Sequence, residues 1–245
     1  MSGSFVDGYK YGLSGLRLLF RPGLRAFVLL PILLNFVVFA AGSWWLIGFL
    51  GRAQSAVTDW LPDWLDWLAW LIWPLAMIAV LVIVWTTFTM IANLLGSPFN
   101  GLLAEKVQRW RRPGHDLPQQ LLWQEVVRAP LTELRKLVYF ALLSIPVVLV
   151  AVIPGVNVLA PLAWATYGAW LLAVEYCDYP LANCGLRLRE ERRILKAHRW
   201  LALGFGAGVL TMTVIPGLNL VAMPSAVIGA SLMWSDRLAG SGQDV

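Results

Sequence analysis

Four long stretches without a charged residue constrain this chain more than any other feature. They are 26–51, 67–104, 137–174 and 200–235, and none contains Lys, Arg, Asp or Glu. Each is longer than the ~18 apolar residues that indicate a membrane segment. Hydrophobic residues make up 59% of the 245 and charged residues only 13%, so a soluble core could not enclose the apolar surface. We therefore expect an all-α integral membrane protein.

The positions of Lys and Arg predict a topology. Of 19 such residues, four precede residue 26, one lies in 52–66, seven in 105–136, six in 175–199 and one follows 235. Basic residues stay on the cytoplasmic side of a membrane. If only the loop 52–66 lies outside, 19 − 1 = 18 of them face the cytoplasm. The first 25 residues show no cleavage pattern, so we expect them to be retained.

This topology divides a single membrane domain, 1–245, into segments with different roles. A stretch that joins the basic side to the outer loop is expected to be one transmembrane helix. A stretch with basic residues at both ends enters and leaves by the same face, and is expected to be a hairpin. The predicted segments are an interfacial N-terminal helix (1–25), two transmembrane helices (26–51 and 67–95), a cytoplasmic helical region (98–136), a hairpin (137–174), a cytoplasmic helix (175–199) and a second hairpin (200–235).

The two hairpin segments contain an internal repeat. Val-Ile-Pro-Gly-Val-Asn-Val at 152–158 is echoed by Val-Ile-Pro-Gly-Leu-Asn-Leu at 214–220. Pro-Gly is a strong turn signal, so both segments are expected to turn there. Arms of ~15–18 residues measure about 22–27 Å, less than the ~30 Å hydrocarbon core. Either the arms are full spans that thin the bilayer locally, or the hairpins are re-entrant and stop partway. The plain alternative is two ordinary tight helical hairpins at the outer surface.

The strongest candidate for chemistry is Arg21-Pro22-Gly23-Leu24-Arg25, where the interfacial helix leads into the first transmembrane helix. A helix N-terminus with guanidinium groups beside it suits a tetrahedral oxyanion. The alternative is a purely topological anchor that keeps this end in the cytoplasm.

A second candidate follows the second transmembrane helix. Ser97 before Pro98 predicts an N-cap and the start of a new helix. On that helix Glu105 and Arg109 are four residues apart and can form an ion pair. This pair is either a solvated surface feature or a support for the basic junction.

Three other patterns have structural interpretations. The acids and tyrosines of 175–180 predict an interfacial belt, with a gate or hydrogen bonds to the arginine cluster as the alternative. The charged run 187–199 predicts a solvated amphipathic helix. Gly-Phe-Gly-Ala-Gly at 204–208 follows no strand, so it favours close helix packing over a nucleotide loop. His115 and His198 belong to no catalytic or metal motif. We expect no enzyme activity, metal, cofactor or nucleic-acid partner.

Four stretches in order resemble the CysZ sulfate transporter family of etoposide-induced-protein-like membrane proteins. They are Pro22-Gly23-Leu24-Arg25 followed by Phe27-Val28-Leu29-Leu30-Pro31, Ile91-Ala92-Asn93 with Pro98-Phe99-Asn100-Gly101-Leu102-Leu103-Ala104-Glu105, Tyr176-Cys177-Asp178-Tyr179-Pro180, and Ile215-Pro216-Gly217-Leu218-Asn219-Leu220.

This resemblance implies sulfate uptake across the bacterial inner membrane for cysteine biosynthesis. It also implies a multi-pass homo-oligomer with two long transmembrane helices and two hemi-penetrating helical hairpins with Pro-Gly-x-Asn turns. A membrane scaffold without transport activity is the alternative, and the choice between a channel and a proton-coupled mechanism stays open.

The resemblance places sulfate at Gly23, Leu24 and Arg25. The residue pattern itself adds Arg21, Glu105 and Arg109 as candidate supporting residues. One departure from the family is Ala26, where members often carry a second arginine. The site is therefore expected to be weaker, or to be compensated by Arg21.

Overall fold

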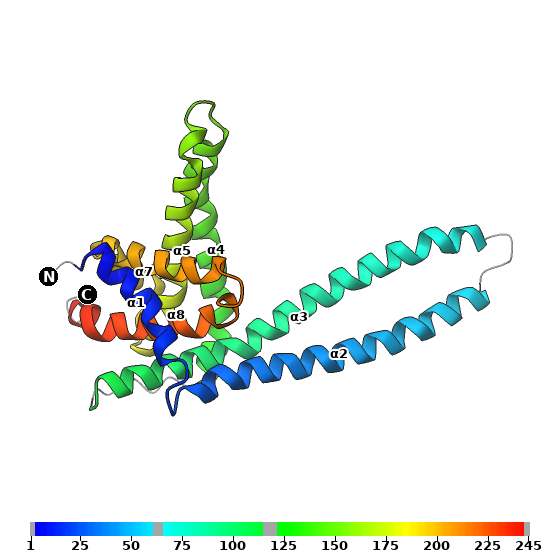
Figure 1. Cartoon of the computed structure of the whole chain (residues 1–245), viewed down its shortest axis with the longest axis horizontal. Helices are drawn as coiled ribbons and strands as arrows, with labels where there is room; N and C mark the ends of the chain where they lie inside the picture. The colour runs from blue at the N-terminus through cyan, green and yellow to red at the C-terminus, as the bar shows by residue number, and fades with distance from the viewer. Residues whose placement is uncertain (1–2, 61–65, 115–121, 243–245) are drawn as a thin grey trace. The chain divides into compact units, whose positions relative to one another are not determined.

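The computed structural model describes residues 3–60, 66–114 and 122–242, and every regular element in these ranges is a helix (Figure 1). Three described helices are long and apolar enough to cross a membrane: Arg25–Arg52, Leu134–Val152 and Asn157–Asn183. The expected all-helical fold class is thereby confirmed. The chain forms two compact units, one of Met1–Val28 with Asn100–Val245 and one of Leu29–Phe99.

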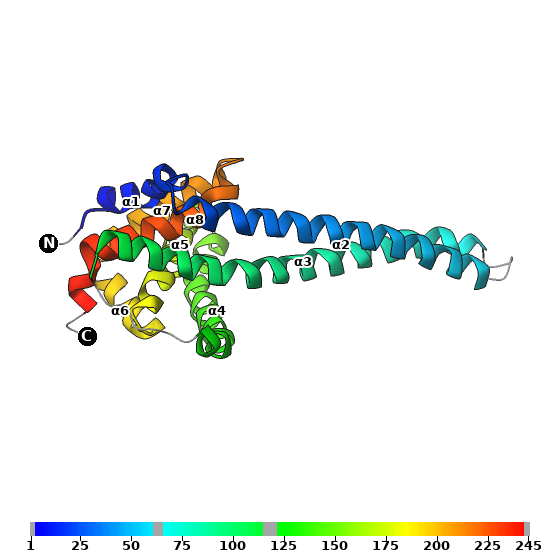
Figure 2. The ribbon, with the colours of Figure 1, turned by 90° about the horizontal axis from the view of Figure 1, so that it is seen from below.

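The Leu29–Phe99 unit consists of most of α2 (Arg25–Trp60) and most of α3 (Asp66–Arg111), which lie side by side (Figures 1 and 2). The apolar span of α2 is 28 residues, about 42 Å at 1.5 Å per residue and longer than a ~30 Å hydrocarbon core. Large apolar side chains such as Phe36, Trp44 and Ile47 are exposed along it. A helix with apolar residues all round faces lipid or is buried in protein.

The expected helix break at Ser97 and Pro98 is wrong. Helix α3 continues through both residues and ends at Arg111. Proline removes one hydrogen bond and costs about 3 kcal/mol inside a helix. Ending the helix there would free several backbone groups beside an apolar stretch, which costs more when water cannot reach them.

In the other unit, α1 (Phe5–Leu18) packs against α7 (Arg199–Val214) and α8 (Asn219–Met233). Helix α1 starts at the N-cap Ser4, whose hydroxyl accepts from Asp7 N at 3.1 Å. Gly8, Gly12 and Gly15 are its buried residues. A Cβ on Gly12 would lie 2.6 Å from the Phe205 carbonyl oxygen of α7, so the two backbones meet because no side chain separates them.

The glycines of 204–208 provide the matching face. A Cβ on Gly204 would collide with the Phe5 carbonyl of α1, and one on Gly206 with the Ala169 carbonyl of α5 (Ala160–Asn183). The prediction that this motif serves close helix packing is therefore confirmed.

Two turns contain the internal repeat. One lies between α4 (Leu122–Val152) and α5 and includes the short helix η2 (Asn157–Leu159), and the other joins α7 to α8. Gly155 and Gly217 have φ of 84° and 86°. Asn157 N donates to Ile153 O at 3.0 Å, and the equivalent bond from Asn219 to Ile215 measures 3.2 Å. The repeat in sequence is thus a repeat in backbone conformation.

Helix α6 (Leu188–Ala197) lies between the two hairpins in sequence. Glu190 caps its start by accepting from Arg187 N at 2.7 Å. Its buried residues are Glu191, Ile194 and Leu195, which share one face at helical spacing. The helix is amphipathic as predicted, but the expectation of a solvated charged run is wrong for Glu191, which is 1% exposed.

Candidate anion site at the turn between α1 and α2

The turn between α1 and α2 is closed by its own backbone. Arg21 N donates to Leu18 O at 3.0 Å, and Arg21 O accepts from Leu24 N at 3.0 Å and from Arg25 N at 3.3 Å. Gly23 has φ of 95°, which favours glycine because a Cβ is strained there. The N–H groups of Leu24 and Arg25 therefore act within the turn, so an anion would be bound chiefly by side chains.

Apolar residues anchor the turn while its charged residues stay outside. Leu19 and Leu24 are 1% and 5% exposed and belong to the hydrophobic core. Arg21, Gly23 and Arg25 are exposed. Leu24, one of the three predicted sulfate-binding residues, thus holds the turn on the core with its side chain, whereas Arg25 remains accessible.

The last turns of α3 bring further groups to this turn. A Cβ placed on Gly23 would lie 3.7 Å from Lys106 Cε and 3.9 Å from its Nζ. Lys106 Nζ also lies 5.1 Å from the centre of the Phe27 ring. The guanidinium carbon of Arg21 is 3.9 Å from the centre of the Trp110 ring, a cation–π contact. Lys106 and Trp110, which the sequence analysis did not select, contact the predicted site.

The predicted pair Glu105 and Arg109 forms an ion pair of 2.7 Å. Their side chains are 33% and 63% exposed, which corresponds to a surface pair of small stability. Glu105 immediately precedes Lys106, and Arg109 immediately precedes Trp110. Consecutive residues of a helix point about 100° apart around its axis. The pair therefore flanks the residues that contact the turn. It also gives the Glu105 carboxylate a partner other than Lys106.

Buried polar contacts fix the end of α3 against α5. Gln108 Nε2 donates to Pro180 O at 2.8 Å, and Asn183 Nδ2 donates to Gly101 O at 3.0 Å and to Gln108 Oε1 at 3.2 Å. Leu103 and Val107 on the same side are fully buried. The helix therefore has one fixed face, and Lys106 is exposed on the other.

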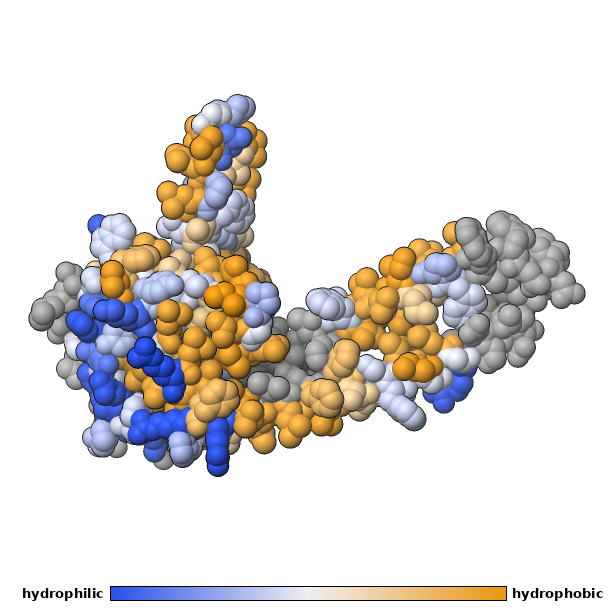
Figure 3. Space-filling model, viewed as in Figure 1, coloured by the Kyte–Doolittle hydropathy of each residue, from blue (hydrophilic) through white to orange (hydrophobic). Residues whose placement is uncertain are grey.

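Together, Arg21, Arg25 and Lys106 make this turn strongly cationic. Hydrophilic surface gathers over α1 and the last turns of α3, whereas the hairpin of α4 and α5 is largely apolar (Figure 3). Guanidinium and ammonium groups bind oxyanions by charge-assisted hydrogen bonds. Within the described ranges, no group of three or more His, Cys, Asp or Glu side chains could hold a metal ion.

These features define a helical membrane protein with a cationic turn beside an apolar span. The sequence profile of the family described as sulfate transporter CysZ/etoposide-induced protein 2.4 matches residues 11–224. The chain belongs to this family.

Three relatives illustrate the similarity. A protein of Pseudomonas aeruginosa named sulfate transporter CysZ is 43% identical over 237 residues, covering 94% of each chain. Proteins of the same name from Pseudomonas fluorescens and Pectobacterium atrosepticum are 44% and 39% identical, covering 94% of this chain and 91% and 85% of theirs. The similarity therefore extends over nearly the whole length.

Proposed function

We propose that this protein transports sulfate across the bacterial inner membrane and supplies it for cysteine biosynthesis. Relatives that share about two fifths of its residues over nearly the full length are named sulfate transporters. Three described helices have the length and composition of membrane spans, which supports a multi-pass location. The names of these relatives favour transport over the scaffold alternative.

The approach of Lys106 to Gly23 carries the site assignment. It adds a third cation to Arg21 and Arg25 at a turn that the sequence analysis selected as a candidate oxyanion site. Sulfate is a dianion, so three cations compensate its charge, and the planar guanidinium of Arg25 can donate two parallel hydrogen bonds to it. Gly23 leaves room for the anion because it has no side chain.

The remaining site residues have supporting roles in this proposal. Leu24 anchors the turn in the core, and Arg21 is oriented by stacking on Trp110. Glu105 and Arg109 neutralise one another, which keeps the acid from competing with sulfate for Lys106. Arg21 and Lys106 together compensate for the second arginine that Ala26 replaces.

The proposed membrane arrangement has two long transmembrane helices, 26–51 and 67–95, and a hemi-penetrating hairpin, 200–235. The arms of the hairpin 137–174 belong to helical stretches of 19 and 27 residues, Leu134–Val152 and Asn157–Asn183, which are longer than the short arms expected from the sequence and long enough to cross. Helix α7 has 16 residues, about 24 Å, which is shorter than a ~30 Å hydrocarbon core. The repeated turns expose apolar side chains, including Val158 and Leu220. Exposed apolar surfaces of this kind are normally in contact with lipid or with protein. Contact with a second copy of the chain would provide such protein, which supports a homo-oligomer.

Uptake of radiolabelled sulfate into liposomes tests the proposal. The wild type is compared with Arg25→Ala, with Lys196→Ala and with empty liposomes. Lys196 is an exposed residue of α6, so its removal controls for the loss of one positive charge. We expect uptake by the wild type and by Lys196→Ala, and strongly reduced uptake by Arg25→Ala.

The controls separate two ways in which the proposal can fail. Wild-type uptake equal to that of empty liposomes, from protein shown to be folded, would contradict transport and favour the scaffold. Equal uptake by the wild type and by Arg25→Ala would instead remove the anion site from this turn and leave the transport activity standing.

A further inference from the structure

A cluster of charged side chains lies inside the larger unit, where α4, α5 and α6 meet. Lys136 of α4 is only 3% exposed, and its Nζ lies 2.6 Å from Asp178 Oδ2 and 3.5 Å from Glu175 Oε2. Glu191 of α6 is 1% exposed. The cluster thus combines one ammonium group with three carboxyl groups.

Glu191 is the unusual member of this cluster. Both of its carboxyl oxygens are buried, and within the described part of the chain neither has a hydrogen-bond partner. Among the neighbouring groups, the Asp178 carboxyl has the largest effect on the Glu191 carboxyl. Two ionised carboxylates are both acceptors, so they can bond only when one of them carries a proton.

The surrounding charges compensate an ionised Glu191 only in part. The single ammonium group of Lys136 balances Asp178, with which it makes its shortest ion pair in the cluster. The side chain of Glu175 is 36% exposed, so water stabilises its charge. An ionised Glu191 would have neither a close ion pair nor water to stabilise its charge. A buried carboxylate without a partner is costly.

The helices beside α6 supply titratable groups that interact with Glu191. Helix α4 provides Lys136, and α5 provides Glu175, the Cys177 thiol and Asp178. At the start of α7, His198 is turned back toward α6, with Nδ1 3.1 Å from Ile194 O.

The balance of these groups favours protonation. Burial, followed by the negative charge of Asp178, raises the pKa of Glu191 well above its ordinary value, and Lys136 opposes this only in part. The described acids, histidines and cysteines form no metal-ligand group, so a metal ion is not expected to replace the proton.

We propose that Glu191 carries a proton at neutral pH and donates it to the Asp178 carboxylate, so that this carboxyl pair is a proton-binding site that fastens α6 to α4 and α5. The proposal does not depend on sulfate transport. It assigns Lys136 the role of holding the Asp178 carboxylate through their 2.6 Å ion pair.

Infrared spectroscopy of the purified protein in detergent tests the proposal directly. A protonated carboxylic acid has a C=O stretching band separate from those of carboxylates and amides. We expect this band in the wild type near neutral pH, and its loss in Glu191→Gln. The control is Glu190→Gln, which removes the neighbouring carboxyl but keeps the cap at the start of α6, because glutamine also caps at that position.

The outcomes are separable even if one variant is unstable. Absence of the band from the wild type at neutral pH would overturn the proposal without any variant. So would a band that persists in folded Glu191→Gln. Loss of the band in Glu190→Gln would assign the proton to Glu190 instead of Glu191 and would contradict the proposal.

Thermal unfolding at different pH values gives a second test. The folded state binds the Glu191 proton more tightly than the unfolded state, so its contribution to stability is present at low pH. That contribution is lost as the pH rises from the ordinary carboxyl pKa through the raised one. From about pH 5 to about pH 9, the midpoint temperature of thermal unfolding should fall further in the wild type than in Glu191→Gln. Parallel curves would contradict the proposal.

Discussion

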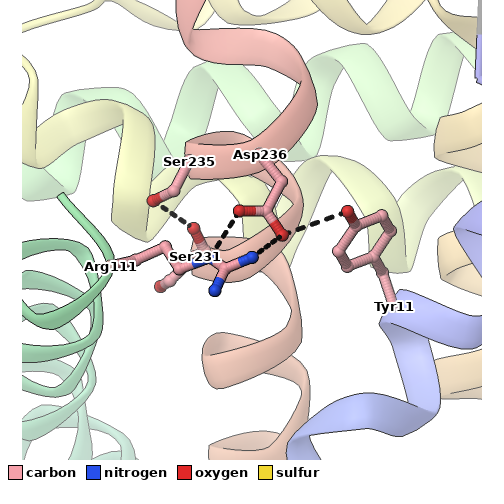
Figure 4. Close-up of polar contacts among 5 residues, drawn as sticks. All are labelled: Tyr11, Arg111, Ser231, Ser235 and Asp236. Carbon is pink, nitrogen blue, oxygen red and sulfur yellow. Dashed lines mark hydrogen bonds and ion pairs between the residues drawn. The ribbon is translucent and has the colours of Figure 1, made fainter.

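Arg111 donates two hydrogen bonds to the carboxylate of Asp236, from Nε to Oδ1 at 2.6 Å and from Nη2 to Oδ2 at 3.2 Å (Figure 4). Tyr11 donates to the same carboxylate, with its hydroxyl 3.2 Å from Oδ2. Asp236 lies in a π-helical segment, η3 (Trp234–Leu238), that follows α8. One carboxylate therefore ties the end of α3 and the middle of α1 to the C-terminal segment.

We expect Asp236→Asn to weaken this junction. The change keeps the size of the side chain but removes its charge and one acceptor, so the paired geometry with Arg111 is lost. Both partners are partly exposed, and the expected loss in unfolding free energy is therefore only about 1 kcal/mol. Thermal unfolding in detergent measures this loss. The control is Arg112→Gln, which changes the exposed residue next to Arg111. Equal stability of Asp236→Asn and the wild type would show that the bond contributes nothing.

Gly12→Ala should destabilise the packing of α1 on α7. The new methyl group would lie 2.6 Å from the Phe205 carbonyl oxygen, so the helices must separate. Overpacking of this kind costs about 1–3 kcal/mol. Gly48→Ala in α2 is the matched control, because nothing lies within 4 Å of a Cβ there and alanine is the better helix former. A thermal midpoint of Gly12→Ala at or above that of Gly48→Ala would contradict the close approach.

The helices were predictable from the sequence because charges are costly in an apolar environment, so the charge-free stretches mark the apolar helices. Their ends were not predictable from charge, since a helix continues into water when its backbone bonds are satisfied. Helix α3 runs past Pro98 to Arg111, and α4 begins before Lys136. Charge pattern reports the environment of a segment, whereas helix ends depend on local backbone bonds.

The proposed anion site was predictable only in its local part. Arg21 to Arg25 are neighbours in sequence, and their proline and glycine predict a turn. Lys106 is far from them in sequence, and only the packing of α3 on the core brings it to Gly23. The same holds for Glu191 and Lys136, whose helices are separated by α5. The spacing of Glu105 and Arg109 correctly predicted their ion pair, but this pair flanks the contact with the turn.

The two repeated turns should respond alike to substitution. Gly155 and Gly217 have nearly equal positive φ, where a side chain adds strain of about 1–2 kcal/mol. We expect Gly155→Ala and Gly217→Ala to lower stability by similar amounts, and the asparagine variants to lower it less, since asparagine tolerates this conformation. No Cβ contact lies within 4 Å of either glycine, so crowding is not expected to contribute. Chemical unfolding of the four variants measures the effect. A large loss of stability at only one of the two turns would show that the two turns do not contribute equally to stability.

Lys106→Met tests the residue that the structure adds to the proposed anion site. Methionine keeps an apolar side chain beside Phe27 but removes the charge that approaches Gly23. If Lys106 contacts sulfate, its loss should weaken binding about tenfold, equivalent to ~1.4 kcal/mol. Calorimetric titration of sulfate at fixed, low ionic strength measures the affinity, because salt screens exposed charges.

Lys196→Met, which removes an equal charge from an exposed position on α6, is the matched control. An affinity lowered equally in both variants would mean that net charge alone attracts the anion. An unchanged affinity in Lys106→Met, alongside a loss in Arg25→Ala, would confine the site to the turn itself. Lys106 would then be a cation that only stacks on Phe27.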